Sequence, residues 1–134
     1  MKRKIRCAAA CLLLLGFTVC PCFAQGVHEK YLALTFDDGP SGQFTRRLLE
    51  GLESRQAQVT FFLCGYRMEQ YPDLAGEMVA AGHEIGLHGY SHSCMSCMEE
   101  EMLEQELSRT EDLLWEQTGV QSSLLRPPGG KAGR

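Results

Sequence analysis

Short hydrophobic runs and longer segments with apolar residues spaced three or four apart alternate along most of this chain. Hydrophobic runs of four to seven residues, bounded by glycine, proline or polar residues, are typical of buried β-strands. They predict strands at residues 31–34, 58–64, 84–87 and 122–125. The first of these runs leads into turn chemistry at Gly39-Pro40.

Between these runs, the three- or four-residue spacing predicts three amphipathic helices. The first helix follows Ser41 as its N-cap, and the second is stopped by Gly82. The third has a capping box at Ser96-x-x-Glu99 and Gly119 just beyond its end. The apolar positions of the three helices are Phe44, Leu48 and Leu52; Leu74, Met78 and Ala81; and Leu103, Leu107, Thr110 and Leu114.

Strands that alternate with helices pair in parallel, so the pattern predicts an α/β layer fold, either a barrel or an open sheet. In both architectures, functional sites gather at the carboxyl ends of the strands. The residues with useful chemistry follow the first, third and fourth predicted strands: Asp37, Asp38, His88, His92 and Arg126. Their positions predict an active site at that edge of the sheet.

The first 24 residues have the pattern of a secretory signal peptide. A basic start is followed by an apolar run at residues 7–20, Pro21 closes the run, and residues 22–24 offer a small-residue cleavage site. Because the run is short for a membrane span, we expect a cleaved signal and a secreted or cell-envelope location. The alternatives are an uncleaved anchor, through which alone the protein would contact a membrane, and a lipid-modified Cys20.

The net charge of the chain indicates which classes of binding partner are disfavoured. The full chain has 13 Lys and Arg against 17 Asp and Glu, and four of the basic residues lie within the first six positions. Without the signal segment, the net charge changes from −4 to −8. The remaining residues, about 110, are enough for one domain with a modest core, and their acidic balance gives no support for binding to nucleic acid or anionic membranes.

Three of the seven cysteines lie outside the signal segment: Cys64, Cys94 and Cys97. Cys94-x-x-Cys97 has the spacing of a zinc knuckle or of a redox pair. No second cysteine pair completes a four-ligand site. A local disulfide or two free thiols is therefore favoured over structural zinc.

Asp37 and Asp38 are adjacent carboxylates that suit one acid–base group and one metal ligand. Neighbouring residues on a strand point to opposite faces, so the two aspartates have different roles unless the turn redirects one of them. An Asx-turn or a helix N-cap is the alternative interpretation of Asp-Asp-Gly-Pro.

His88 and His92 lie four residues apart, and on a helical turn this spacing puts both rings on one side. Two surface histidines near a tight turn are the alternative. Together with a carboxylate from another strand end, the pair predicts a two-histidine, one-aspartate metal site. Such a site leaves positions open for water and substrate.

Three segments together resemble the polysaccharide deacetylase family (NodB-homology domain, carbohydrate esterase family 4). Residues 35–40 (Thr-Phe-Asp-Asp-Gly-Pro) match its first motif, His88-x-x-x-His92 matches its second, and residues 126–130 (Arg-Pro-Pro-Gly-Gly) are similar to its third. The resemblance covers roughly residues 30 to 131. It implies the N-terminal portion of a distorted (β/α) barrel, with about four strands alternating with three helices and the barrel incomplete.

The resemblance also implies a role for each motif residue. Asp38, His88 and His92 would bind a divalent metal, usually zinc. Asp37 would be the general base that takes a proton from water, which agrees with the physical logic of metal-assisted hydrolysis. Arg126 would orient Asp37 as a charge-assisted partner, its alternative being a surface charge at a strand end.

Gly129 and Gly130 would contact substrate, and the backbone N–H of Gly129 would help to hold the oxyanion. The implied reaction is hydrolysis of an N-acetyl group of an amino-sugar polysaccharide, with release of acetate. Peptidoglycan is the favoured substrate and a chitin-like glycan is another, while no residue specifies an oligomeric state.

Two departures from the family pattern change these expectations. Gly89 stands where Ser or Thr is usual, which predicts a looser loop between the two histidines. The sequence also ends at Arg134, before the Leu-x-His segment that supplies the general acid in the family. We therefore expect residues 25–134 to be a partial deacetylase domain truncated at its C-terminus. The alternatives are a non-catalytic glycan- or metal-binding fragment and a chain without a stable fold.

Overall fold

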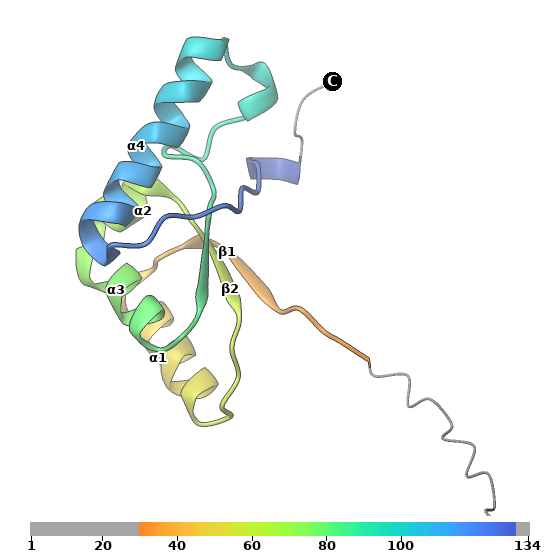
Figure 1. Ribbon diagram of the computed structural model, residues 1–134, viewed down its shortest axis with the longest axis vertical. Coiled ribbons are helices and arrows are strands. Elements are labelled where there is room, and N and C mark those ends of the chain that lie inside the picture. Colours follow the sequence, from red (N-terminus) through yellow and green to blue (C-terminus); the bar gives the residue numbers. More distant parts are fainter. Residues whose placement is uncertain (1–29, 131–134) are drawn as a thin grey trace, which may run out of the picture. The chain divides into compact units, whose positions relative to one another are not determined.

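Three short parallel strands form the centre of the fold, in the order β1-β2-β3 (Figure 1). The computed structural model describes residues 30–130, and the expected signal peptide at residues 1–24 lies outside this described part. The strands are β1 (Thr35–Gly39), β2 (Thr60–Leu63) and β3 (Glu84–Leu87). Parallel pairing of successive strands requires a crossover between them, and a helix lies in each crossover, as the sequence pattern predicts.

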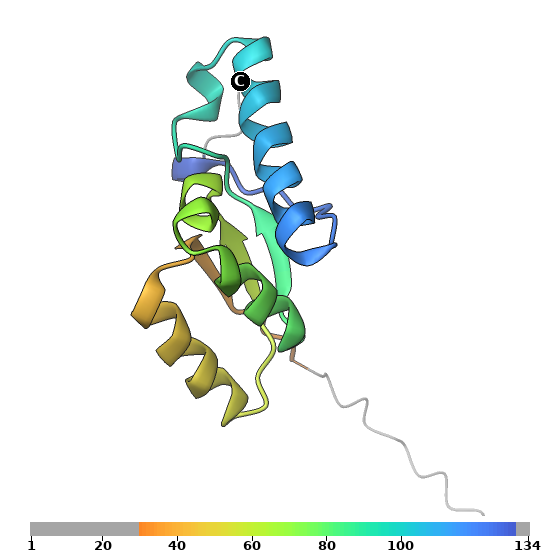
Figure 2. The same ribbon diagram turned by 90° about the vertical axis from the view of Figure 1, so that its left-hand side faces the viewer.

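Four α-helices pack on one face of this sheet. They are α1 (Gly42–Glu53), α2 (Gly65–Gln70), α3 (Pro72–Ala80) and α4 (Glu100–Thr118), with two 3₁₀ turns, η1 (Met95–Cys97) and η2 (Pro128–Gly130). Figure 1 shows the helices to the left of the strands, and Figure 2 shows them in front of the sheet when viewed from that side. Within residues 30–130, no helix covers the opposite face, and none is long and apolar enough to cross a bilayer.

Side chains alternate between the two faces of the sheet, as strand geometry requires. Phe61 and Leu63 of β2 point toward the helices, as do Ile85 and Leu87 of β3. The helices supply the other half of this buried core: Leu52 from α1, Met68 from α2, Ala75 and Met78 from α3, and Leu114 from α4. Hydrophobic burial against the helices therefore determines which strand residues remain for the opposite face.

The face without helices carries Thr60 and Phe62 of β2 beside Glu84 and Gly86 of β3. The Thr60 hydroxyl donates a hydrogen bond of 2.7 Å to the Glu84 carboxylate. The Phe62 ring lies over Gly86, where an added Cβ would be 2.4 Å from the ring carbons. Gly86 is thus required by the close approach of an aromatic ring.

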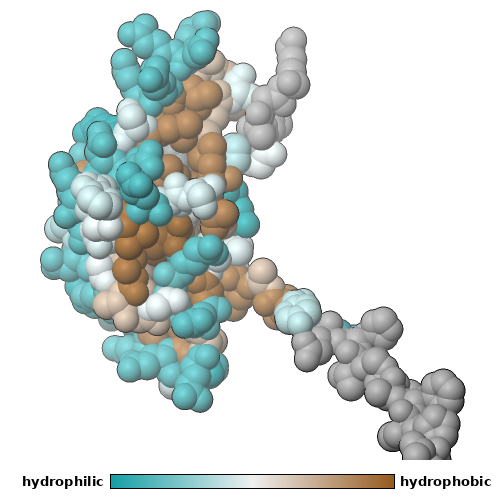
Figure 3. Space-filling view, in the orientation of Figure 1, coloured by the Kyte–Doolittle hydropathy of each residue, from teal (hydrophilic) through white to brown (hydrophobic). Residues whose placement is uncertain are grey.

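The strand segments differ from the sequence prediction at both edges of the sheet. Tyr31 and Leu32 are 88% and 90% exposed, and they precede β1, whose register with β2 begins at Thr35, opposite Thr60. Figure 3 shows hydrophobic surface where the chain enters β1. The predicted fourth strand at 122–125 makes only an isolated parallel bridge from Leu125 to β3, so the described sheet has three strands.

The helices also differ from the prediction. The periodicity does not reveal α2, because six residues are too few to show a repeating apolar face. The capping box is wrong, since Ser96 lies in η1 and α4 begins after Glu99. Ser41 precedes α1 without a side-chain capping bond, and Phe44 is exposed while Thr45 is buried. Gly119 lies just beyond the end of α4, as predicted, and it has the αL conformation common at such positions.

Candidate active site

The predicted site residues converge at the carboxyl end of the sheet. Asp37 and Asp38 lie in β1, and His88 directly follows β3. The Arg126 N–H donates a hydrogen bond of 2.9 Å to the carbonyl of Leu87, which places Arg126 next to the end of β3. Backbone pairing therefore brings side chains from both ends of the described chain to one edge.

A local irregularity in β1 separates the two aspartates. The register with β2 shifts between Phe36 and Gly39, and Asp38 has a φ of 65°. Aspartate is one of the few non-glycine residues that enter the left-handed region. Asp37 lies two residues after Thr35 and so on the same face, whereas the left-handed backbone redirects Asp38. The two carboxylates therefore have different surroundings, and the left-handed backbone at Asp38, which strand alternation does not predict, contributes to this difference.

Asp38, His88 and His92 form a compact group of metal-ligating atoms. The Asp38 Oδ1 atom lies 3.1 Å from His88 Nε2 and 2.9 Å from His92 Nε2, and all three atoms lie within 4.8 Å of one another. The two histidine rings come together without a helical turn. Residues 88–92 form a loop, in which φ values of 79° at Gly89 and 62° at His92 bring the ring centroids to 5.1 Å.

The buried His88 ring is held in the orientation that a ligand needs. Its Nδ1 atom lies 2.5 Å from the backbone carbonyl oxygen of Arg126. A carbonyl oxygen only accepts hydrogen bonds, so Nδ1 carries a proton, and Nε2, 3.1 Å from Asp38 Oδ1, is the ring nitrogen left to bind a metal. The donor set and its second contact therefore fit a divalent metal.

Residues with a left-handed backbone conformation are concentrated among the candidate metal ligands. Three non-glycine residues in the described chain have positive φ: Asp38, Gln56 and His92. Such conformations cost roughly 1–3 kcal/mol each and persist where the surrounding structure maintains them. Two of the three belong to the candidate ligands, which favours a functional site over an ordinary surface turn.

Arg126 contacts Asp37 across a separation of 89 residues in sequence. Its Nη1 atom donates to Asp37 Oδ1 at 2.6 Å and to Thr35 Oγ1 at 2.8 Å. The guanidinium also stacks on the Phe62 ring, with Cζ 4.0 Å from the centroid. Both charged side chains remain more than one third exposed, so the pair orients Asp37 more than it stabilises the fold. Arg126 is therefore not a free surface charge.

Glu106 of α4 supports the loop of residues 88–92, called the histidine loop below. The sequence does not reveal this role. One carboxylate oxygen, Oε2, accepts hydrogen bonds of 2.8 Å from the backbone N–H groups of both Tyr90 and Ser91. These two residues lie between His88 and His92. Glu106 sits among several glutamates of one helix, and no spacing in the sequence distinguishes it from the others.

Gly89 has a steric reason to be glycine in this fold. An added Cβ would lie 2.8 Å from Met95 Cε and 4.0 Å from Pro128 Cγ, and the φ of 79° already disfavours other residues. The expected looseness of the loop stays a prediction.

The η2 turn follows Pro127, and the Gly130 N–H donates a hydrogen bond of 3.1 Å to the Pro127 carbonyl.

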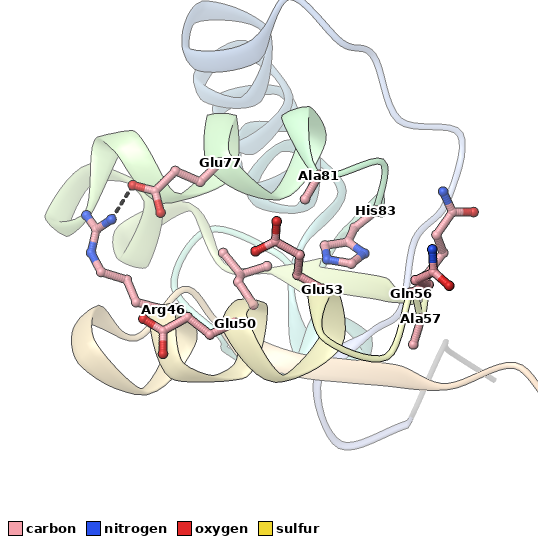
Figure 4. A pocket seen from close by; sticks show the side chains of 10 residues that line it. Arg46, Glu50, Glu53, Gln56, Ala57, Glu77, Ala81 and His83 are labelled. Carbon is pink, nitrogen blue, oxygen red and sulfur yellow. Dashed lines mark hydrogen bonds and ion pairs between the residues drawn. The ribbon is translucent and has the colours of Figure 1, made fainter.

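A large cavity lies elsewhere, at the amino ends of the strands. It has a volume of about 690 Å³ and is lined by residues of α1, α3 and the segments that enter β2 and β3. Figure 4 shows the Glu53 carboxylate and the His83 ring facing it, with an Arg46–Glu77 ion pair at its side. The described residues contain one group that could hold a metal, and it is not in this cavity.

The family profile described as polysaccharide deacetylase matches residues 24–134. A peptidoglycan-N-acetylglucosamine deacetylase of Bacillus cereus is 34% identical over 109 residues, which are 81% of this chain and 40% of that protein. The structure of the peptidoglycan deacetylase PdaC from Bacillus subtilis has a TM-score of 0.74 and 33% identity, and the match covers 77% of this chain and 51% of that one.

A family 4 acetyl xylan esterase from Clostridium thermocellum, in complex with a cobalt ion, has a TM-score of 0.72 and 32% identity. That match covers 75% of this chain and 50% of the esterase. The chain thus spans about half the length of these solved structures, or less of some relatives, and its three-stranded sheet corresponds to the N-terminal part of their barrel. With its motif residues gathered at one sheet edge and the profile matching from residue 24 onward, the chain belongs to the polysaccharide deacetylase family.

Proposed function

We propose that this chain provides the metal site and the general base of a hydrolase that removes acetyl groups from an N-acetylated amino-sugar polysaccharide. The observation that carries the proposal is the Asp38, His88 and His92 group with the Asp37–Arg126 pair beside it. A metal-ligand set next to a carboxylate that is not a ligand is the arrangement that metal-assisted hydrolysis needs.

Zinc is the ion that we propose for this site. Two imidazole nitrogens and one carboxylate oxygen leave one position of a tetrahedron open, as in catalytic zinc sites. The Arg126 carbonyl that holds His88 is the kind of outer contact that orients such ligands. When bound, the ion supplies Lewis-acid polarisation of the acetyl carbonyl and lowers the pKa of water.

The residues around the ion have separate tasks. Asp37 accepts the proton of the attacking water, because Arg126 holds its carboxylate in place and it is free of the ligand group. We assign the Gly129 N–H to stabilisation of the oxyanion, and the exposed Gly129–Gly130 turn to contact with the sugar. These assignments follow the third family motif.

Peptidoglycan is the substrate that we favour, because two of the relatives described above are named as peptidoglycan deacetylases. Export by a signal peptide at residues 1–24 would bring the site to cell-envelope glycans. The acetyl xylan esterase relative supports an acetyl ester as a second class of substrate for the same chemistry.

A second candidate function is a glycan- or metal-binding fragment without turnover. The observation in its favour is that the chain spans only about half the length of the solved relatives that it matches. Its prediction is stoichiometric metal binding without release of acetate.

Acetate release from N-acetylated peptidoglycan, measured with zinc and after chelation, tests both functions. Metal-dependent release that Asp37→Asn abolishes supports the deacetylase. Zinc binding without release supports the binding fragment, and failure to bind zinc contradicts both. An acetylated xylan in parallel distinguishes amide from ester hydrolysis.

A further inference from the structure

Two exposed cysteines face each other beside the histidine loop. Cys94 precedes η1 and Cys97 is its last residue, and their Sγ atoms are 2.8 Å apart. Side chains three residues apart eclipse in a 3₁₀ helix, because it has three residues per turn. The backbone conformation therefore brings the two thiols together, and neither forms a disulfide in this structure.

The residue between them packs against the candidate metal site. Met95 is buried, and its Cε atom occupies the space where a Cβ on Gly89 would lie, at 2.8 Å. Gly89 directly follows the candidate ligand His88. The conformation of η1 therefore determines whether Met95 packs against Gly89 in the histidine loop.

The third cysteine of the described chain lies in a contrasting environment. Cys64 is fully buried at the end of β2, and burial raises the pKa of its thiol to about 12. A buried thiol with a raised pKa is inert toward thiol reagents. Cys64 thus provides an internal control for the exposed pair.

We propose that Cys94 and Cys97 are an oxidisable dithiol site whose oxidised form is a disulfide across η1 that holds Met95 against Gly89. A structural zinc is disfavoured, because among the described residues no third ligating side chain joins the two sulfurs. The proposal rests on this geometry and does not depend on deacetylase activity.

The oxidant is a small-molecule disulfide such as oxidised glutathione. The sulfur of one cysteine bonds to one sulfur of the reagent, and the other reagent sulfur leaves as a thiol. The second cysteine then displaces the remaining reagent sulfur and forms the Cys94–Cys97 bond. In total the protein loses two protons and two electrons, and the reagent gains them as two free thiols.

Peptide mapping of the whole chain tests the proposal. After incubation with oxidised glutathione, the remaining thiols are alkylated under denaturing conditions and the chain is digested with trypsin. Residues 68–109 form one peptide with both Cys94 and Cys97, and residues 56–67 form another with Cys64. We expect the first peptide to carry no alkyl group and to be about 2 Da lighter than its reduced form, while Cys64 is alkylated.

Alkylation of both Cys94 and Cys97 after this treatment would overturn the proposal, as would stable mixed disulfides or disulfide-linked dimers at these residues. Hydrogen exchange tests the link to Met95. We expect oxidation to slow exchange of the Cys97 and Met98 amides, which donate to Cys94 and Met95, by at least about threefold. Unchanged exchange contradicts the link.

Matched variants complete the test. A Cys94→Ser, Cys97→Ser double variant should show no change in exchange on addition of oxidised glutathione, whereas Cys64→Ser should respond as the natural sequence does. An equal response in the double variant would assign the effect to another thiol and contradict the proposal.

Discussion

Two histidines at opposite ends of β3 have similar burial and different surroundings. His83 lies just before the strand, packs edge-on against Phe61 with ring centroids 5.3 Å apart, and has no hydrogen-bond partner for its Nδ1 among the described residues. His88 lies just after the strand, and both of its ring nitrogens have partners, the Arg126 carbonyl and the Asp38 carboxylate. Burial is thus shared, and only one histidine has convergent polar partners.

The same contrast separates the two ends of the sheet. The cavity at the amino end of the sheet is lined by Glu50, Glu53 and His83 (Figure 4). Its volume exceeds that of the pocket beside Asp37 and Asp38 at the carboxyl end, called the ligand end below. The ligand end instead brings one carboxylate and two imidazoles within 4.8 Å. Cavity size alone would select the wrong end, whereas the geometry of ligating atoms selects the end that the family motifs occupy.

The largest expected effect is loss of the metal at the ligand end. His88→Ala or His92→Ala should reduce bound zinc from about one ion per chain to near zero, because two remaining ligands do not hold the ion. His83→Leu should leave zinc content unchanged. Elemental analysis of dialysed protein measures both. Equal loss in all three variants would mean that the effect is one of folding and would remove the distinction between the two ends.

Asp37→Asn should separate catalysis from metal binding. We expect acetate release to fall by about 10²–10⁴-fold, since the amide cannot accept the proton of the attacking water. Zinc content should stay at the level of the natural sequence. Asp112→Asn, at an exposed position of α4, is the control. A metal-free Asp37→Asn protein would show that the division of roles between Asp37 and Asp38 is wrong.

Glu106→Gln should weaken the ligand end without removing a ligand. The neutral amide is a poorer acceptor for the N–H groups of Tyr90 and Ser91, and outer contacts of this kind change metal affinity by about 10–100-fold. Zinc titration measures the affinity. Glu104→Gln, exposed on the same helix, should bind zinc as the natural sequence does, and an equal loss there would assign the effect to helix charge.

The smallest effect is expected at the amino end. Burial lowers the pKa of His83 below its usual value of 6.5, so the unfolded state binds the proton more readily. His83 therefore reduces stability as the pH falls below 6.5. In His83→Leu, the free energy of unfolding should depend less on pH between 8 and 5, and at pH 8 it should be unchanged or higher by about 1 kcal/mol.

Urea unfolding at the two pH values checks this prediction. The carboxylates of Glu50, Glu53 and Glu77 line the same cavity and also titrate, so Glu53→Gln serves as the comparison. An unchanged pH dependence in His83→Leu would show that His83 contributes nothing to the acid sensitivity of the fold.

Local patterns in the sequence predict the two strands that pack against the helices on one face, β2 and β3. β3 is found at the predicted residues 84–87, and β2 lies within the predicted 58–64, because each is bounded by polar or glycine residues and packs against helices. The runs at 31–34 and 122–125, each with two leucines, form no ladder. Their conformation depends on which neighbour is available to pair with them, and hydrophobicity does not carry that information.

The sequence by itself determined the α/β class and the identities of the motif residues. It did so because hydrophobic periodicity and motif spacing are local properties of the chain. Only the tertiary structure decided that Asp38 is redirected by a left-handed backbone, that Arg126 contacts Asp37, and that Glu106 supports the histidine loop. These contacts join residues far apart in sequence through backbone pairing and helix packing, and no local pattern encodes which of several similar side chains will meet.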